Sequence, residues 1–428
     1  MAPADREFDV VVIGAGPAGM AAAWAAARQD GGSAGLRVAV VDDNPSAGGQ
    51  IWRGRNAGEL WFDRFAQSGA VLLAGHRVVG RGIDKQTLMM DSGPPLRFGR
   101  LILATGAREL FLPFPGWTLP GVMGAGGLQA MVKGGLASHG RRVVVAGSGP
   151  LLLAVAATLA DSGAEVLAVA EQAPGVRVRR LGLGLLWRDV AKLVEAAALR
   201  CRVPYRTDAW PVRALGDGRR LTAVELMVEG QLHLVECDYL ACGFGLVPNN
   251  ELAAHLGCTF DRGGFVRVDE RQRTSQPAVF CAGEPTGIGG LDRALIEGQI
   301  AGYAAAGALG RADALAGERA RADEWRAALD ETFSLRPEVT RLAMADTPVC
   351  RCEEVNWGTL QAWRSWRAAK LQTRCGMGPC QGRVCGPALE RLLGWSTAAV
   401  PDLVRVPLAP VEARVLGLAD CDTHVSNR

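Results

Sequence analysis

The chain has 428 residues, of which 49% are hydrophobic and 21% charged, and its net charge is +3. This is a globular composition, and the length exceeds what one ordinary core can organise, so we expect two or three domains. The small net charge gives no reason to expect a nucleic acid or an anionic membrane surface as partner.

The first residues do not resemble a signal peptide, and no apolar run approaches the roughly 20 residues of a transmembrane helix. We therefore expect a cytoplasmic protein without a transmembrane segment. Association with a membrane through partners stays open.

A dinucleotide-binding turn is predicted near the N-terminus. Residues 10–13 are four β-branched residues, typical of a strand buried on both faces. G-x-G-x-x-G follows as Gly14, Gly16 and Gly19, with Pro17 and Ala18 before the last glycine, and an Ala-rich helix is predicted at 20–27. The first glycine permits the turn, the second lets backbone approach a pyrophosphate, and the third lets the helix lie close to the strand.

A second strand, predicted at 37–41, ends at Asp42 and Asp43, where a carboxylate would accept hydrogen bonds from a ribose. We prefer Asp42 because it follows the hydrophobic run directly. The phosphate-binding features do not distinguish FAD from another ADP-containing ligand. Backbone at Gly49 and Gln50 is also expected to lie against the cofactor, because glycine lets the chain approach closely.

A second unit of the same kind is predicted from residue 143, with a turn at Gly147 and Gly149 and a second strand ending at Glu171. The third glycine is replaced by Leu152, which should push the helix away from the strand or block a ligand. Two interpretations stay open. The unit is either a domain kept for architecture or an altered nucleotide site formed by Gly147, Gly149 and Glu171. Three arginines after this strand, at 177, 179 and 180, fit a 2′-phosphate or a solvated basic face.

Eleven cysteines occur in the chain, and five of them lie between residues 350 and 385. Cys350 and Cys352 form C-x-C, whereas Cys380 and Cys385 form C-x-x-x-x-C. Four thiolates can bind zinc or a 2Fe–2S cluster, and the Gly-rich surroundings favour the cluster because backbone N–H groups must reach its sulfides. Buried structural thiols are the alternative. The second dinucleotide unit contains no C-x-x-C, which argues against a thiol–disulfide reductase.

The order of these motifs over residues 8–305 resembles the two-dinucleotide-fold flavoprotein oxidoreductases. The resemblance implies an α/β fold with two Rossmann-like dinucleotide-binding domains, one inserted in the other. It also implies that the turns at Ala104, Thr105 and Gly106 and at Gly283 lie along FAD, and that Glu284, where Asp is commoner, bonds the ribityl chain. We expect an FAD domain at 1–115 and 246–308, a connector at 116–140, an inserted NAD-type domain at 141–245, a helical linker at 309–345, a cluster domain at 346–395 and a tail at 396–428.

Residues 350–385 resemble the 2Fe–2S domain of bacterioferritin-associated ferredoxin in the version fused to flavoprotein subunits. The resemblance implies a small α-helical domain with Cys350, Cys352, Cys380 and Cys385 as ligands. Cys375 stands where relatives often carry a small residue, and we treat it as a spare thiol.

The fusion resembles the larger, or alpha, subunit of opine oxidases and of hydroxyproline and dye-linked proline dehydrogenases, and a subunit of hydrogen cyanide synthase. It implies an oxidoreductase acting on CH–NH donors, in which a separate flavoprotein beta subunit oxidises the amine and this chain carries electrons away. Further expectations are FMN at a subunit interface and a small third subunit.

No catalytic residue is predicted in this chain, because its five histidines lie in no motif. Two alternatives stay open. The first is a self-sufficient NAD(P)H-dependent FAD/2Fe–2S reductase, against which Leu152 counts. The second is a non-enzymatic scaffold or redox sensor.

Overall fold

The computed structural model describes residues 6–28, 35–54, 57–82, 84–188, 190–395, 405–413 and 415. The chain divides into two compact units. The first is made of Met1–Arg108, Pro248–Arg326 and Ala398–Arg428, and the second of Glu109–Val247 and Ala327–Thr397. The middle of the chain is thus inserted between two stretches of the first unit.

The first unit is built on a sheet with strand order β3-β2-β1-β6-β5-β4, in which β17 also pairs with β6. Strands β1, β2, β3, β6 and β17 run parallel, and β4 and β5 are antiparallel. Their bounds are β1 (Glu7–Ile13), β2 (Val38–Asp42), β3 (Val71–Ala74), β4 (Val78–Arg81), β5 (Thr87–Met90), β6 (Leu96–Leu103) and β17 (Val279–Cys281). Val10 to Val12 are fully buried, as expected for a strand covered on both faces.

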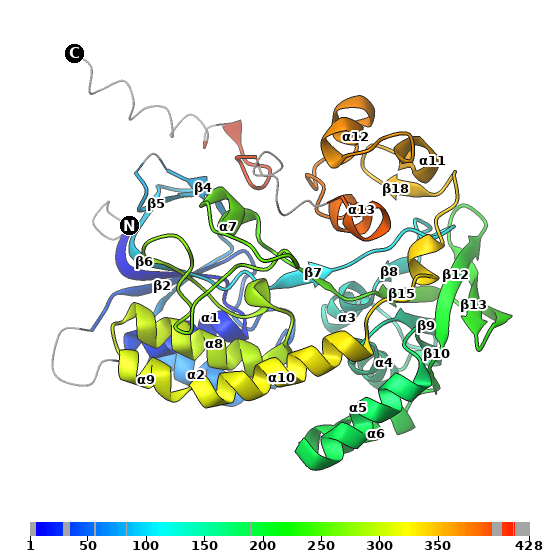
Figure 1. Cartoon of the computed structure of the whole chain (residues 1–428), viewed down its shortest axis with the longest axis horizontal. Helices are drawn as coiled ribbons and strands as arrows, with labels where there is room; N and C mark the ends of the chain where they lie inside the picture. Colours follow the sequence, from blue (N-terminus) through cyan, green and yellow to red (C-terminus); the bar gives the residue numbers. More distant parts are fainter. Residues whose placement is uncertain are drawn as a thin grey trace. The chain divides into compact units, whose positions relative to one another are not determined.

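Helices α1 (Pro17–Ala27) and α8 (Gly290–Ala305) lie side by side beside this sheet (Figure 1). Small residues allow their backbones to approach closely. A Cβ at Gly298 would lie 2.2 Å from the carbonyl oxygen of Ala18, and one at Gly302 would lie 2.2 Å from that of Ala22. The other helices beginning in this unit are α2 (Glu59–Gln67), α7 (Glu251–His255), η2 (Glu284–Thr286), α9 (Leu309–Ala314) and α10 (Ala316–Thr332).

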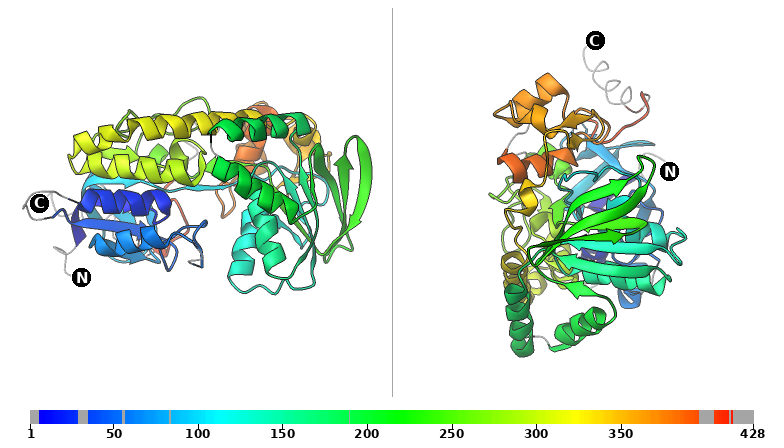
Figure 2. Two further views of the ribbon diagram at one scale, coloured as in Figure 1. Left: turned by 90° about the horizontal axis from the view of Figure 1, so that it is seen from below. Right: turned by 90° about the vertical axis from the view of Figure 1, so that its right-hand side faces the viewer.

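The second unit contains a five-stranded parallel sheet with strand order β11-β10-β9-β15-β8. Alternate residues of β9 pack in two different cores. Val143 and Val145 pack with α4, whereas Val144 and Ala146 pack with an antiparallel sheet, β12-β13-β14. Figure 2 shows this antiparallel sheet as the brighter green strands. The bounds are β8 (Val122–Gly124), β9 (Arg142–Gly147), β10 (Glu165–Glu171), β11 (Tyr205–Arg206), β12 (Ala209–Gly216), β13 (Leu221–Val228), β14 (Gln231–Glu236) and β15 (Tyr239–Gly243), with helices α3 (Ala125–Lys133) and α4 (Leu151–Asp161).

Several elements differ in detail from the sequence-based expectations. Strand β8 and helix α3 lie within residues 116–140, where the sequence suggested a connector. Two helices follow β10, α5 (Gly175–Arg188) and α6 (Val190–Cys201). Strands β7 (Ala107–Glu109) and β16 (Leu246–Pro248) pair with each other.

The cysteine-rich end of the second unit is a small, mainly helical region after the short helix η3 (Val339–Arg341). Its elements are β18 (Pro348–Cys350), β19 (Val355–Asn356), α11 (Trp357–Leu360), α12 (Trp366–Thr373) and α13 (Cys385–Leu393). The stretch between the two cysteine pairs therefore contains two helices, α11 and α12. Ser365 begins the second of them, because its side chain accepts a hydrogen bond from the amide of Ala368.

Candidate functional site

The glycine turn after β1 cannot carry side chains at two of its three glycines. Gly14 has φ +103°, and a Cβ there would lie 2.2 Å from the carbonyl oxygen of Ala104. A Cβ at Gly19 would lie 1.7 Å from the carbonyl oxygen of Gly14. Helix α1 begins at Pro17, and no side chain caps it. Its first-turn amides are thus directed to whatever lies outside the turn, which is the geometry that suits a phosphate.

The two aspartates at the end of β2 have different surroundings. Asp42 is 9% exposed and accepts hydrogen bonds from the amides of Ala15, at 2.6 Å, and Asn44, at 2.8 Å. Asp43 is exposed and pairs with Arg77 at 2.7 Å. Asp42 therefore braces the glycine turn directly, which Asp43 does not. Its contact with a ribose remains a prediction.

The segment around Gly49 lies against the same turn. The amide of Gly48 donates to the carbonyl of Ala15 at 2.8 Å, and a Cβ at Gly49 would come within 3.0 Å of the Cα atom of Gly16. Gln50 is exposed and accepts a hydrogen bond from Arg53 at 3.2 Å.

The turn at the end of β6 is also adjacent. The amide of Ala104 donates to the carbonyl of Ile13 at 2.9 Å, which ties this turn to β1. The hydroxyl of Thr105 donates to the carbonyl of Asn249 at 2.7 Å, and the Asn249 side-chain amide donates to the carbonyl of Thr105 at 2.9 Å. Gly106 accepts from the amide of Asn249. Sequence reasoning missed Asn249, because nothing near it in the chain marks it as a partner of residue 105.

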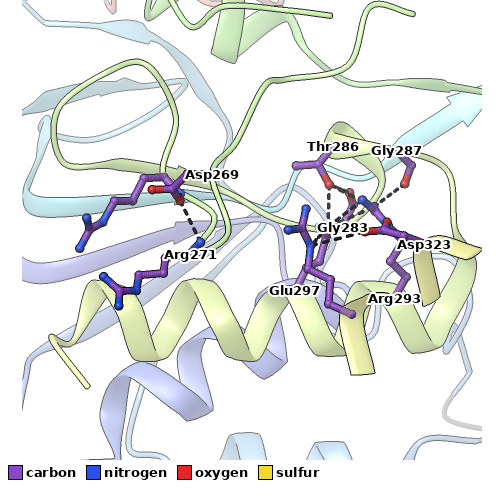
Figure 3. A network of polar contacts seen from close by, with 10 residues as sticks. Asp269, Arg271, Gly283, Thr286, Gly287, Arg293, Glu297 and Asp323 are labelled. Atoms are coloured by element: carbon purple, nitrogen blue, oxygen red, sulfur yellow. Dashed lines mark hydrogen bonds and ion pairs between the residues drawn. The ribbon is translucent and has the colours of Figure 1, made fainter. Parts of the chain in front are cut away.

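A buried acid, Glu297, holds the turn at Gly283 and Thr286 in place (Figure 3). Glu297 on α8 has no exposed surface, and its carboxylate accepts hydrogen bonds from the amide of Gly283 at 2.9 Å and the hydroxyl of Thr286 at 2.6 Å. The guanidinium of Arg293, 3% exposed, lies 2.7 Å from the same carboxylate. Gly283 has φ +80°, so the turn also depends on its having no side chain.

Two further charges complete this network. Arg293 donates to Asp323 and to the carbonyl of Gly287, at 2.8 and 2.9 Å, and Arg319 donates to Glu297 at 3.3 Å. Sequence reasoning missed the whole group. The available signal was an Arg and a Glu four residues apart in a helix otherwise rich in small residues.

Glu284 itself is half-buried at the surface of this turn. Burial raises its pKa to about 7, although the nearby Arg293 lowers it. A carboxyl that is protonated over part of the physiological range can donate as well as accept a hydrogen bond. This suits the hydroxyl groups of a ribityl chain.

The glycine turn of the second dinucleotide fold departs from the first at the helix. A Cβ at Gly147 would lie 2.0 Å from the carbonyl oxygen of Gly243, but the space beside Gly149 is open. Leu152 is fully buried and packs with Val145 and Val155 in the core between β9 and α4. This position therefore serves the core.

The acid at the end of β10 is enclosed. Glu171 has no exposed surface and accepts hydrogen bonds from the amides of Gly149, at 2.7 Å, and Ala173, at 2.8 Å. Burial raises its pKa to about 7. The carboxylate thus braces its own turn. The next residue, Gln172, is also fully buried and contacts residues 334 and 336.

The predicted cluster cysteines gather in the small helical region. The Sγ atoms of Cys350, Cys375 and Cys385 lie within 4.8 Å of one another, and those of Cys352 and Cys380 are 3.8 Å apart. Hydrogen bonds from Cys375 and Cys385 lower the pKa of Cys350, and this interaction raises the pKa of both donors. The structure therefore brings the four predicted ligands into two pairs. It also places Cys375 beside the buried pair.

The surroundings of these thiols fit a metal cluster. A Cβ at Gly378 would lie 2.3 Å from the Cβ of Cys352, and Gly376, at φ +79°, has no room for a side chain beside Trp366. Backbone thus lies close to the sulfur atoms on the side of residues 376–378. Soft thiolates in this number select zinc or iron–sulfur centres. Cys352 is exposed, so one edge of the group reaches the surface.

The two glycine turns, each between a parallel strand and a helix, with an acid at the end of the next strand, define a two-dinucleotide-fold oxidoreductase. The predicted fold class is thereby confirmed.

The chain belongs to the pyridine nucleotide-disulphide oxidoreductase family, whose sequence pattern it matches over residues 8–310. It is 33% identical to the hydrogen cyanide synthase subunit HcnB of Pseudomonas aeruginosa, over 89% of this chain and 92% of the relative. It is 30% identical to a subunit of the opine oxidase of Rhizobium meliloti, over 94% and 97%. The predicted resemblance to these subunits is confirmed.

Solved structures agree on the fold. Thioredoxin reductase of T. acidophilum is 25% identical, with a TM-score of 0.56 over 71% of this chain and 99% of that chain. L-proline dehydrogenase of P. horikoshii is 18% identical, with a TM-score of 0.65 over 96% and 79%. The chain is an oxidoreductase by its family, and both relatives are named as enzyme subunits. Among the described residues, no helix is both long and apolar enough to cross a membrane.

Proposed function

We propose that this chain is the flavin and iron–sulfur electron-transfer subunit of a heteromeric dehydrogenase or oxidase acting on an amino acid or opine. A separate flavoprotein beta subunit would oxidise the amine, and a small third subunit would complete the complex. The observation that carries the proposal is the group of five thiols built onto a two-dinucleotide-fold flavoprotein. The relatives named as subunits of opine oxidase and hydrogen cyanide synthase support it.

The residues proposed to hold FAD are those around the first glycine turn. The turn at Gly14–Gly19 and the amides of α1 would bind the pyrophosphate, and Asp42 would lie at the ribose. The turns at 49–50, 104–106 and 283–284 would lie along the rest of the cofactor, with Glu284 at the ribityl chain. A flavin bound there accepts and releases one or two electrons. The chain's own task is to hold it and shield it from water.

The proposed ligands of a 2Fe–2S cluster are Cys350, Cys352, Cys380 and Cys385. The exposed sulfur of Cys352 would put the cluster near the surface, where a partner can exchange electrons with it. Cluster potentials span about −700 to +450 mV, so the ligand set does not fix the direction of transfer. FMN at a subunit interface is a further proposal, and so is a cytoplasmic location.

A self-sufficient NAD(P)H-dependent reductase is the second candidate, but the second dinucleotide fold counts against it. Leu152 fills the place of the third glycine, and the acid at the end of β10 has no exposed surface. A non-enzymatic scaffold or redox sensor would bind its nucleotide and cluster only for structure, and its flavin would not change redox state when a candidate partner turns over.

The proposal is tested with the full chain purified under anaerobic conditions. It should contain two irons, two acid-labile sulfides and extractable FAD per chain. Alone, it should not oxidise proline, hydroxyproline or an opine. Co-expressed with its amine-oxidising partner, it should speed the transfer of substrate electrons to a dye, and cluster reduction should be visible by electron paramagnetic resonance.

Two results would refute this assignment. Full-rate amine oxidation by the isolated chain would place the substrate site here, and zinc or free thiols in place of iron would remove the cluster. Rapid anaerobic bleaching of the flavin by NADH would favour the second candidate instead.

A further inference from the structure

We infer that the second dinucleotide fold binds a segment of its own chain, residues 331–336, where a pyridine nucleotide would place its adenosine half. This occupant makes the fold a docking surface within the second unit. The inference goes beyond the proposed function and does not depend on it, since it concerns neither the flavin nor the cysteines.

The location follows from the topology of the parallel sheet. Ligands of such sheets bind outside the carboxyl ends of the strands. Strand β9 ends at Gly147 and β10 ends at Glu171, so Ser148 and Gln172 are the first residues beyond the two ends. These two side chains lie where the pyrophosphate turn meets the adenosine ribose. They also contact each other at 2.9 Å.

Both side chains are bonded to the segment. The hydroxyl of Ser148 donates to the carbonyl of Phe333 at 2.9 Å. The amide nitrogen of Gln172 donates to the carbonyl of Ser334 at 3.2 Å, and its oxygen accepts from the amide of Arg336 at 3.0 Å. Gln172 is fully buried, so these contacts satisfy a side chain that no solvent reaches.

Two of the three arginines that follow β10, for which a 2′-phosphate contact and a solvated basic face were both open, contact the segment. Arg177 donates to the hydroxyl of Ser334 at 2.8 Å, and Arg180 lies 3.6 Å from Glu331. In the opposite direction, Arg336 of the segment lies 3.2 Å from Asp208 and 4.6 Å from the ring centroid of Trp210. Polar partners thus line the segment from several elements of the fold.

Apolar contacts anchor the segment on either side of Arg336. Leu335 and Val339 pack in the core that contains β9, β10 and the antiparallel sheet. The segment thus covers the adenosine end through Ser148 and Gln172, while the space that a Cβ at Gly149 would occupy stays open. A nucleotide would have to displace several hydrogen bonds, each worth about 1 kcal/mol, before it could bind, which lowers its apparent affinity.

Amide hydrogen exchange of the full chain, with and without millimolar NADH or ADP, tests the inference. Without nucleotide, the amide of Arg336 should exchange slowly. In Gln172→Ala it should exchange about tenfold faster, because its acceptor is lost. Unchanged protection of the β9 amides would show that the variant is folded. Ser334→Ala is the matched control, since it removes the exposed contact with Arg177 and a hydrogen bond to the carbonyl of Glu331 but keeps the acceptor of the Arg336 amide, which should stay protected.

The two nucleotides give the decisive comparison. The inference is supported if neither binds, and equally if one binds while the segment loses its protection, because the two would then compete. Binding of NADH or ADP with the segment still protected would overturn it. So would exchange of the Arg336 amide at the rate of an unstructured peptide. Iron and FAD content report separately on the proposed function, so failure of one proposal is distinguishable from failure of the other.

Discussion

Two acids at equivalent places in the two dinucleotide folds do the same local work. Asp42 accepts hydrogen bonds from the backbone amides of residues 15 and 44, and Glu171 accepts them from those of residues 149 and 173. Each carboxylate therefore ties its glycine turn to the chain that follows the second strand. They differ in burial, since Glu171 has no exposed surface and Asp42 has a little.

The burial of Glu171 predicts a pH-dependent stability. Its pKa is raised from 4.5 to about 7 by burial, so between these pH values the folded chain holds a proton that the unfolded chain has released. The free energy of unfolding should therefore fall by about 3 kcal/mol from this group as the pH rises from about 4.5 to 8. Denaturant titrations at several pH values should show a smaller fall in the free energy of unfolding in Glu171→Gln, because glutamine does not titrate. An equal slope in both proteins would contradict the prediction.

The close contact at Gly19 predicts that even a methyl group there will be destabilising. In Gly19→Ala the new methyl group would overlap the carbonyl of Gly14, so the helix must shift, at a cost of about 2 to 3 kcal/mol. Thermal unfolding and the fraction of bound FAD should both fall. Gly310→Ala is the control: its Cβ meets nothing within 4 Å, and alanine favours the helix by up to about 1 kcal/mol. Equal stability of the two variants would show that the close packing is not needed.

At the scale of elements, α8 has two faces with different tasks. Gly298 and Gly302 allow close contact with α1, while Arg293 and Glu297 hold the turn at Gly283. One helix thus joins the first and last segments of the flavin fold, which are far apart in the sequence. A sheet of parallel strands needs such a helix to cover it.

Breaking the buried pair on α8 should cost far more than breaking an exposed one. Glu297→Ala takes one of two carboxylates from the buried guanidinium of Arg293, leaving Asp323 as the other, and leaves the amide of Gly283 unpaired, at about 3 kcal/mol. Chemical denaturation measures the loss, and we expect weaker FAD retention with it. Asp313→Ala removes a surface pair with Arg271 of similar length, 2.8 Å, and should change stability little. A small effect of Glu297→Ala would contradict the proposed bracing.

At the scale of the whole molecule, the chain combines two dinucleotide folds and a thiol cluster, each built within one compact unit. The cluster thiols come from residues 350–385 of the second unit, and the proposed flavin residues belong to the first. Electron transfer between flavin and cluster would therefore couple the two units, and each can be tested by its own cofactor.

The ligand assignment predicts the iron content of single variants. Cys380→Ser and Cys352→Ser should each lower iron and acid-labile sulfide well below two per chain, because each removes one sulfur of the outer pair. Cys375→Ala should keep both near two. Iron analysis and visible absorption provide the measurement, with FAD content as the control for folding. Loss of iron in Cys375→Ala would make that residue a ligand.

The fold was predictable because its signals are local. The β-branched run at residues 10–13 and the three glycines after it lie within one short stretch, and the structure has the expected strand, turn and helix there. Helix boundaries were less predictable. Residues 357–370 contain two helices, because Ser365 caps the second one. Likewise, Leu152 could be identified as an exception to the glycine pattern, but its packing in the core could not.

The sequence by itself determined the family, the two glycine turns and the set of cysteines, since each depends on residue types at fixed short spacings. Only the tertiary structure decided which residues from distant segments meet. It placed Glu297 against Gly283, Asn249 beside Thr105, Cys375 beside the buried sulfur pair, and residues 331–336 against Gln172. The physical reason is that side-chain hydrogen bonds and packing depend on distances in space. The spacing of residues along the chain does not determine those distances for segments far apart in the sequence.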